Sequence, residues 1–187
     1  MTKSLAGTVD QGIVVDEQNE YAQWRMETAS YGNAAFLTGT VELSFNPVFM
    51  TLDGKEHRLF ALGGTAGSGI LLRKGAQNQG NATQILTYLG GVQVGLTEVD
   101  SNNFWFFPGT WETIRITWDF TVGAGVQNVH LYFNDAEHTY ANTSTGPVAF
   151  PMATTERITL GAWTTADKAV AGGIFDEIRI WDQVVPP

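Results

Sequence analysis

The sequence predicts an all-β protein folded as an antiparallel β-sandwich of the jelly-roll kind, and three observations lead to this prediction. Short runs rich in Val, Ile, Thr and aromatic residues are separated by turn residues, with 21 glycines and 6 prolines among 187 residues. Several of these runs alternate polar and apolar side chains, which is the period of a half-buried strand. No segment keeps the apolar period of a helix, and the best helical candidate, residues 17–28, lacks a clean apolar stripe. Many short strands between regularly spaced turns are typical of a sandwich.

The expected strands follow one another along the chain. The run Thr40–Phe45 alternates clearly and stops at Asn46-Pro47, because proline cannot donate to a sheet. Gly90-Gly91 is expected to be a two-residue hairpin turn, and Asn134-Asp135 ends a later strand. Strands are expected at 40–45, 57–62, 69–73, 82–89, 92–96, 111–120, 129–133, 157–163 and 173–181. No linker or repeat interrupts them, so residues 1–187 are interpreted as a single domain.

The closing strand, 173–181, is the most informative segment. Strict alternation places Ile174, Ile178 and Ile180 on one face, with Asp176 among them. A carboxylate on an otherwise apolar face needs backbone N–H groups, a cation or water as partners. The pattern therefore predicts a bound partner for Asp176.

Composition and charge exclude several classes of function. The chain has no cysteine, which excludes disulfides and thiolate metal sites. Its apolar runs are far shorter than the ~20 residues that span a bilayer. The 10 Lys and Arg against 19 Asp and Glu give a net charge of −9, which repels phosphate backbones and anionic lipids. Neither nucleic acid nor a membrane is expected as a partner, whereas neutral glycans, cations and a basic protein are compatible.

The first residues give an expectation about location. Residues 1–7 contain one lysine and no apolar segment, so they do not have the pattern of a signal peptide. The chain is expected in the cytoplasm or a virion as written, or outside the cell if it is excised from a larger secreted protein.

Five segments resemble, in order, the sequence pattern of laminin-G-like and concanavalin-A-like jelly-roll domains. They are Thr38–Pro47, Pro108–Asp119, His130–Asp135, Ile158–Gly161 and the closing Asp-Glu-aliphatic-Arg-aliphatic-aromatic run at 176–181. Two departures are Phe45, where this pattern often has a tryptophan, and Asp135, which replaces the usual glycine. The resemblance implies the sandwich fold and a non-catalytic recognition domain, with carbohydrate as the leading ligand class.

The residues do not favour an enzyme. Retaining jelly-roll glucanases need two carboxylates about 5–5.5 Å apart. The nearest acidic pair, Asp176-Glu177, is adjacent in sequence and so points to opposite faces of a strand. The expectation is a protein without catalytic residues.

The resemblance also implies a structural calcium ion. Many such modules hold Ca²⁺ between an early loop and the Asp of the closing strand, through the oxygen ligands that this cation prefers. By this resemblance Asp176 would be a ligand, with Asp16 or Glu17 as partners. The alternative is that Asp176 accepts backbone hydrogen bonds and anchors a loop. No other cofactor is expected.

Aromatic residues supply the candidate ligand-binding side chains. The run Phe104–Phe107 is the densest in the chain, and alternation buries at most two of its four rings. A sugar ring could stack on Trp105 while Asn102 and Asn103 bond its hydroxyls. The alternative is that this run is covered inside the sandwich or at a subunit contact. Trp24 could stack with a ligand or close the sandwich as a lid.

A second candidate surface lies on the face opposite Ile114 and Leu131, where Arg115 and Tyr132 would form a binding floor. The alternative for these residues is cross-strand charge pairing. The function predicted from the sequence is carbohydrate binding or adhesion. The alternative is a structural component of an assembly, such as a virion decoration or fibre-associated protein.

Overall fold

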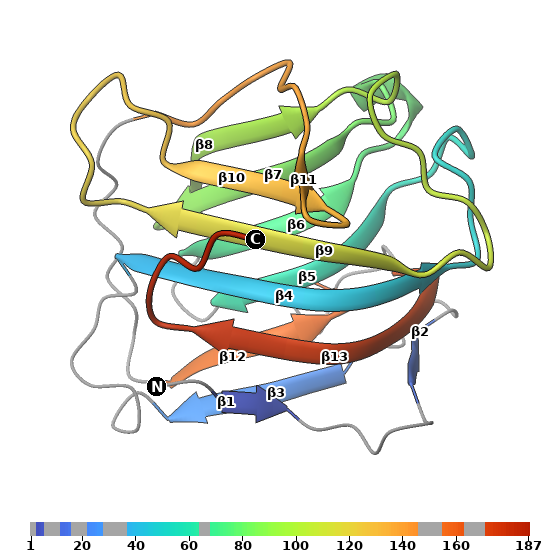
Figure 1. Ribbon diagram of the computed structural model, residues 1–187, viewed down its shortest axis with the longest axis horizontal. Helices are drawn as coiled ribbons and strands as arrows, with labels where there is room; N and C mark the ends of the chain where they lie inside the picture. The colour runs from blue at the N-terminus through green and yellow to red at the C-terminus, as the bar shows by residue number, and fades with distance from the viewer. Residues whose placement is uncertain are drawn as a thin grey trace.

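The structure is a computed structural model. It describes residues 3–5, 12–15, 22–27, 37–63, 68–145, 155–162 and 171–187, with the backbone alone at 3–5, 23–27 and 155–157. The described residues form two antiparallel sheets packed face to face (Figure 1). This confirms the predicted all-β jelly-roll sandwich. No helix in these ranges is long and apolar enough to cross a membrane.

The first sheet has seven strands. Their order is β1 (Lys3–Leu5), β13 (Gly173–Trp181), β4 (Thr38–Pro47), β9 (Glu112–Asp119), β10 (Val129–Phe133) and β11 (Ala136–Glu137), with β2 (Ile13–Val15) also paired to β13. The second sheet has six strands. Their order is β3 (Ala22–Glu27), β12 (Thr155–Leu160), β5 (His57–Gly63), β6 (Gly69–Lys74), β7 (Thr83–Leu89) and β8 (Val92–Val99). A short 3₁₀ turn, η2 (Gln77–Gln79), joins β6 to β7.

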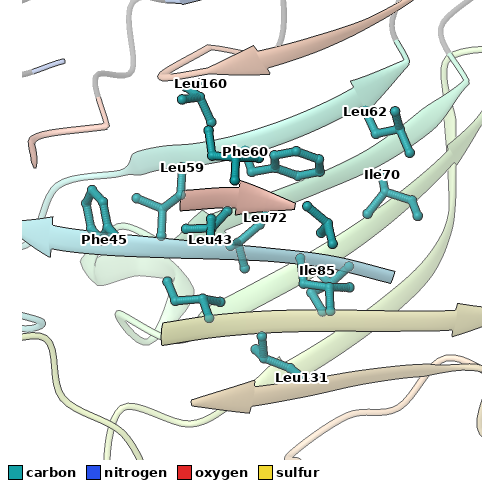
Figure 2. Packing of buried hydrophobic residues seen from close by; sticks show 14 of the residues in the cluster. Leu43, Phe45, Leu59, Phe60, Leu62, Ile70, Leu72, Ile85, Leu131 and Leu160 are labelled. Carbon is teal, nitrogen blue, oxygen red and sulfur yellow. The ribbon is translucent and has the colours of Figure 1, made fainter. Parts of the chain in front are cut away.

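The strands alternate as the sequence predicts, and their inward faces form one core between the sheets. Ile114, Ile116 and Trp118 of β9 are buried there, beside Val129 and Leu131 of β10. Figure 2 shows side chains from both sheets meeting in this layer: Leu43, Phe45, Leu59, Phe60, Leu62, Ile70, Leu72, Ile85, Leu131 and Leu160. The alternate side chains of β4, β9, β10 and β13 point away from the core and form the outer face of the seven-stranded sheet.

Residues 22–27, inside the best helical candidate, form strand β3 instead of a helix. They pair along their whole length with β12 at the edge of the second sheet. The local sequence pattern does not decide between helix and strand here, and the pairing with β12 makes the segment a strand.

The expected alternation of the closing strand is wrong at Glu177. A β-bulge interrupts the pairing of β13 with β4 between Asp176 and Arg179, and Glu177 adopts a left-handed backbone with φ 49°. The bulge shifts the alternation by one residue, so Phe175 and Ile178 are both buried in the core. Asp176 therefore lies on the outer side of the strand and not among the core side chains. Its Oδ1 accepts a hydrogen bond from the backbone N–H of Glu177 at 2.8 Å.

Candidate functional site

Three charged residues form a row across the outer face of the seven-stranded sheet. Glu42 on β4 is in register with Arg115 on β9 on one side and with Arg179 on β13 on the other. Glu42 and Arg115 are largely buried, while Arg179 is 43% exposed. Because cross-strand neighbours on one face lie within contact distance, this register brings three residues that are distant in sequence into one network.

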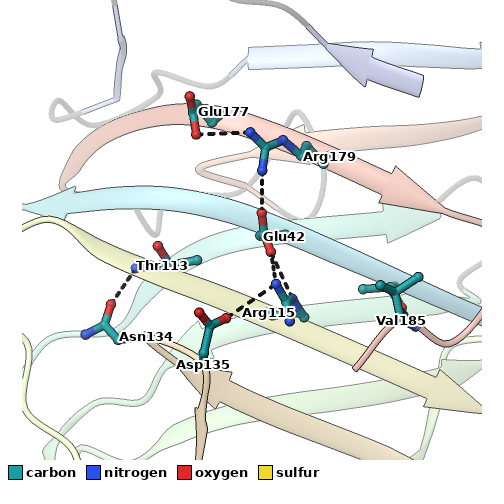
Figure 3. A network of polar contacts seen from close by, with 9 residues as sticks. Glu42, Thr113, Arg115, Asn134, Asp135, Glu177, Arg179 and Val185 are labelled. Carbon is teal, nitrogen blue, oxygen red and sulfur yellow. Dashed lines mark hydrogen bonds and ion pairs between the residues drawn. The ribbon is translucent and has the colours of Figure 1, made fainter. Parts of the chain in front are cut away.

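Both guanidinium groups bind the same carboxylate (Figure 3). Arg115 donates from Nε to Oε2 of Glu42 at 2.8 Å and also from Nη2, and Arg179 donates from Nη1 to Oε1 at 2.9 Å. Nη1 of Arg115 is buried and has no hydrogen-bond partner among the described residues. Such a buried donor leaves hydrogen-bonding capacity unsatisfied at this point of the outer face.

Two further carboxylates border the row. Asp135 lies in the turn between β10 and β11, and its Oδ1 is 3.4 Å from Nη2 of Arg115. Asn134 and Asp135 both have positive φ, the conformation of the two-residue hairpin turn that places Asp135 over β9. On the other side, Nη2 of Arg179 is 3.3 Å from Glu177, the residue at the bulge. The network therefore presents two cations and three anions, most of them partly exposed.

Tyr132 and His130 extend the row onto β10. Tyr132 is in register with Arg115, and its ring stacks on that of His130 with a centroid distance of 6.4 Å. Burial and the nearby charge of Glu137 raise the pKa of Tyr132 above its ordinary value. Its hydroxyl therefore stays protonated at neutral pH and keeps a hydrogen to donate. The structure thus brings together the predicted pair, Arg115 and Tyr132.

An exposed tryptophan lies one residue before β9. Trp111 is 49% exposed. If the alternation of β9 continues back from Arg115 and Thr113, which point outward, its indole lies at the margin of this face. A rise of about 3.4 Å per residue places it roughly 13 Å from the Arg115 backbone.

The chain after β13 folds back over the outer face and closes its other margin. The Thr40 hydroxyl donates to the carbonyl of Gln183 and accepts from the N–H of Val185, both at 2.8 Å. Thr40 and Thr117, which point outward beside the charged row, are buried. Figure 3 shows Val185 on the same side of the sheet as Arg115. The row therefore lies between this C-terminal segment and the β10–β11 turn.

A second surface lies at the end of the sandwich, where β4 ends and β9 begins. Phe106 is fully buried, whereas its neighbours Trp105 and Phe107 are 36% and 49% exposed. The two exposed rings are nearly parallel, at 18°, with centroids 6.2 Å apart. The expectation that at most two rings of the run are buried is confirmed.

The two predicted asparagines beside Trp105 make contacts within their own neighbourhood. The carboxamide of Asn102 donates to Asp100 Oδ1 at 2.7 Å, and that of Asn103 reaches the Thr139 carbonyl at 3.5 Å. The structure therefore groups Trp105 with Asn102 and Asn103 at this end. Arg115 and Tyr132 lie within strands β9 and β10 on the outer face.

The other predicted site residues are only partly placed. Trp24 lies in β3 in register with Ile158, and its side chain is outside the described part of the structure. The proposed calcium partners of Asp176, namely Asp16 and Glu17, lie outside the described residues. Among the residues that are described, no group of three or more His, Asp or Glu could hold a metal ion.

Sequence reasoning missed Glu42 and the exposed position of Trp111. Glu42 stood out only as a polar residue in an alternating strand, because its two arginine partners come from distant segments. The alternation of Thr40–Phe45 predicts that Glu42 points outward. Only the order of strands in the sheet shows that Glu42 lies between two arginines.

Comparisons with known proteins support the fold. No protein-family model matches the sequence, and no match is found among curated proteins. Among solved structures, the chain is similar to the CBM40 module of the Ruminococcus gnavus IT-sialidase, with 13% identity, a TM-score of 0.62 and coverage of 99% of this chain and 93% of that one. It is also similar to the NanB sialidase from Streptococcus pneumoniae, with 13% identity and a TM-score of 0.61, covering 99% of this chain.

This chain spans only 26% of the NanB chain. A third neighbour is domain 4 of AbnA, an extracellular arabinanase from Geobacillus stearothermophilus solved with arabinotriose, with 18% identity, a TM-score of 0.52 and coverage of 96% and 74%. These similarities, all at low identity, show the jelly-roll sandwich fold alone. They do not test the laminin-G part of the resemblance, which stays a prediction.

Proposed function

We propose that this protein is a non-catalytic carbohydrate-binding module and that the outer face of the seven-stranded sheet is its binding site. The observation that carries the proposal is the row in which Arg115 and Arg179 share the carboxylate of Glu42. Fold similarity adds support, because the R. gnavus CBM40 module has also been solved bound to α2,3-sialyllactose, with 12% identity to this chain and a TM-score of 0.61.

The chemistry of this face suits a sugar. Hydroxyl groups both donate and accept, so they bind best where fixed donors and acceptors alternate. The row offers guanidinium donors beside the exposed Asp135 acceptor, and the hydrogen bonds of Glu42 to both arginines hold these groups in place. The C–H faces of a sugar ring pack on aromatic rings, and Trp111 supplies an exposed one at the margin of the face.

The row can serve two kinds of sugar. A neutral sugar would use the exposed carboxylates of Asp135 and Glu177 as acceptors and leave the ion pairs of Glu42 intact. An acidic sugar would place its carboxylate against the guanidiniums in competition with Glu42. The experiment is isothermal titration of α2,3-sialyllactose, lactose and arabinotriose into the protein, followed by a broad glycan array.

Saturable binding of any glycan, together with no change in that glycan after prolonged incubation, supports a non-catalytic module. Release of a cleaved product contradicts the non-catalytic part of the proposal. Absence of binding across the whole array contradicts the carbohydrate part.

Two predictions from the sequence accompany this proposal. Stacking of a sugar on Trp105 beside Asn102 and Asn103 would add a second contact at the end of the sandwich. The alternative, a structural component of an assembly such as a virion, stays a prediction, and the exposed apolar side chains at that same end are its only support among the described residues.

A further inference from the structure

The carboxylate of Glu42 occupies the position that an acidic sugar would need on the outer face of the seven-stranded sheet. One of its oxygens accepts from Arg115 and the other accepts from Arg179 (Figure 3). Paired guanidiniums are the groups that bind a carboxylate most strongly, through charge-assisted hydrogen bonds. The protein itself therefore supplies the carboxylate that these two arginines bind.

The other nitrogens of the two arginines are also engaged or covered. Nη2 of Arg115 donates to Glu42 and lies 3.4 Å from Oδ1 of Asp135, and Nη1 of Arg115 is buried. Nη2 of Arg179 lies 3.3 Å from Oε2 of Glu177. To form a bidentate contact with either guanidinium, a sugar carboxylate would have to displace a carboxylate of the protein.

Displacing Glu42 is unfavourable. Its side chain is largely buried, and so is that of Arg115. When one partner of a buried ion pair is removed, the other is left as an uncompensated charge away from water. An acidic sugar that took the place of Glu42 would leave this carboxylate unpaired beside a second negative charge.

Exposed carboxylates stand at both ends of the row. The side chains of Asp135 and Glu177 are 67% and 60% exposed. Two arginines against three carboxylates, +2 and −3, leave the row with a net charge of −1 on a chain of net charge −9. Like charges repel over the Debye length, about 10 Å at 0.1 M salt, so a carboxylated ligand is repelled before it reaches the arginines.

The same exposed carboxylates suit a neutral sugar. An ionised carboxylate is only an acceptor, and a sugar hydroxyl can donate to it. Hydroxyls can reach Asp135 and Glu177 from solvent while the hydrogen bonds of Glu42 stay in place. A neutral saccharide therefore gains charge-assisted hydrogen bonds here without leaving a buried charge unpaired.

We infer that this site takes neutral saccharides and rejects carboxylated ones, and that Glu42 sets the selectivity. This selectivity rests on the proposed carbohydrate function and names the class of sugar that the same site takes. Glu42 acts through the two arginines, so it is a positioning residue whose charge decides which ligands they can bind.

The test is binding of the purified chain to an array that carries neutral saccharides beside carboxylated counterparts, such as lactose beside α2,3-sialyllactose and galactose oligomers beside galacturonic acid oligomers. Calorimetric titration then measures each pair in which a member binds. The neutral member is expected to bind at least tenfold more tightly, and its binding should be lost in the Arg115→Ala, Arg179→Ala double variant.

Glu42→Gln tests the residue that sets the selectivity. The variant keeps the shape of the side chain but removes the negative charge between the arginines, so the affinity ratio of neutral to carboxylated ligand should fall at least tenfold. Glu56→Gln is the matched control, because Glu56 is likewise shared by two arginines, Arg58 at 2.6 Å and Arg73 at 3.2 Å, whose strands lie in the other sheet. It removes the same unit of charge and should leave the ratio unchanged.

Asp135→Asn is a second variant that does not disturb a buried group. Its side chain is exposed, and asparagine tolerates the positive φ of this turn position. The variant is expected to lower the affinity for the neutral ligand and to raise that for the carboxylated one. A ratio that stays the same in both Asp135→Asn and folded Glu42→Gln overturns the inference.

The wild-type protein alone also decides. If the carboxylated member of a pair binds as tightly as the neutral one or more tightly, and the arginine double variant abolishes that binding, the selectivity is wrong while the proposed carbohydrate function stands. If no glycan binds, or binding survives loss of both arginines, the proposed site fails and the selectivity fails with it.

Discussion

Glu42 and Arg115 are cross-strand neighbours on the outer face of the seven-stranded sheet, and their side chains meet through two hydrogen bonds to a single carboxylate oxygen. The other oxygen of Glu42 accepts from Arg179. Because both partners of the carboxylate are guanidiniums from flanking strands, the row also fixes the relative positions of β9, β4 and β13. The charged groups of the proposed site are therefore held in place by one another without a ligand.

Removing either arginine is expected to weaken glycan binding. Arg179→Ala should lower the affinity for a bound saccharide at least tenfold, which corresponds to about 1.4 kcal/mol. The reason is the loss of a partly exposed, charge-assisted donor. Calorimetric titration measures the change. Arg58→Ala, which removes an arginine paired with Glu56 on the opposite sheet, is the control and should bind as the wild type does.

Two neighbouring residues of the aromatic run, Phe106 and Trp105, should contribute very differently to stability. Phe106→Ala empties a fully buried position and is expected to lower the free energy of unfolding by about 3–5 kcal/mol. Trp105→Ala changes an exposed side chain and should cost about 0.5 kcal/mol or less. Urea denaturation of both variants measures this difference. Equal losses would show that Trp105 is part of the core.

The pH dependence of stability should contain a contribution from Asp53. Burial acts to raise the pKa of this carboxyl, but hydrogen bonds from Lys74 and His57 outweigh burial and lower the pKa below its ordinary value of 3.8. The folded protein thus holds the Asp53 proton less tightly than the unfolded chain does. The stabilisation is present above the unfolded-state pKa and is lost as the pH falls through the lower pKa of the folded state.

Asp53→Asn is expected to destabilise the protein at neutral pH. It should also remove part of the loss of stability that the wild type shows as the pH falls. Thermal unfolding from neutral pH down to below 3.8 measures both effects. If the melting temperature of Asp53→Asn falls with pH in parallel with that of the wild type, Asp53 does not contribute to the pH dependence of stability. Because Lys74 is fully buried with its ammonium on Asp53, Lys74→Met is the variant that separates loss of the ion pair from loss of the carboxylate.

The calcium ion implied for Asp176 stays a prediction with a simple test. If the ion is bound, chelator lowers the melting temperature of the wild type, and Asp176→Asn removes the difference. A melting temperature that is the same with and without chelator rejects a structural calcium site. The hydrogen bond from Glu177 N–H would then be the role of this carboxylate among the residues that the structure describes.

The fold could be predicted because the alternation of polar and apolar side chains within each strand is visible in a short stretch of sequence. Alternation along Thr40–Phe45 and through Ile114, Ile116 and Trp118 fixes which face of each strand is buried, and the structure confirms those faces. The bulge at Glu177 could not be predicted in this way. A single residue other than glycine in a left-handed conformation leaves no mark in the sequence, yet it reverses the face assigned to Asp176.

The candidate site was only partly predictable for a different reason. Arg115 and Tyr132 share one face by alternation alone, so their grouping follows from two strands that are near one another in sequence. Glu42 and Arg179 join them only through the pairing of β4 with β9 and β13, which depends on the order of strands in the sheet. Local patterns do not contain that order.

The most direct test of the proposed site is a nuclear magnetic resonance titration of the ¹⁵N-labelled protein with the tightest-binding saccharide from the array. The expected result is a set of shifts at the outward positions of β4, β9, β10 and β13 near Glu42, Arg115 and Arg179, together with Trp111 and the turn at Asp135, and the loss of these shifts in the Arg115→Ala, Arg179→Ala double variant. Shifts that cluster at Trp105 and leave these strands unchanged, or shifts that persist in the double variant, would contradict it.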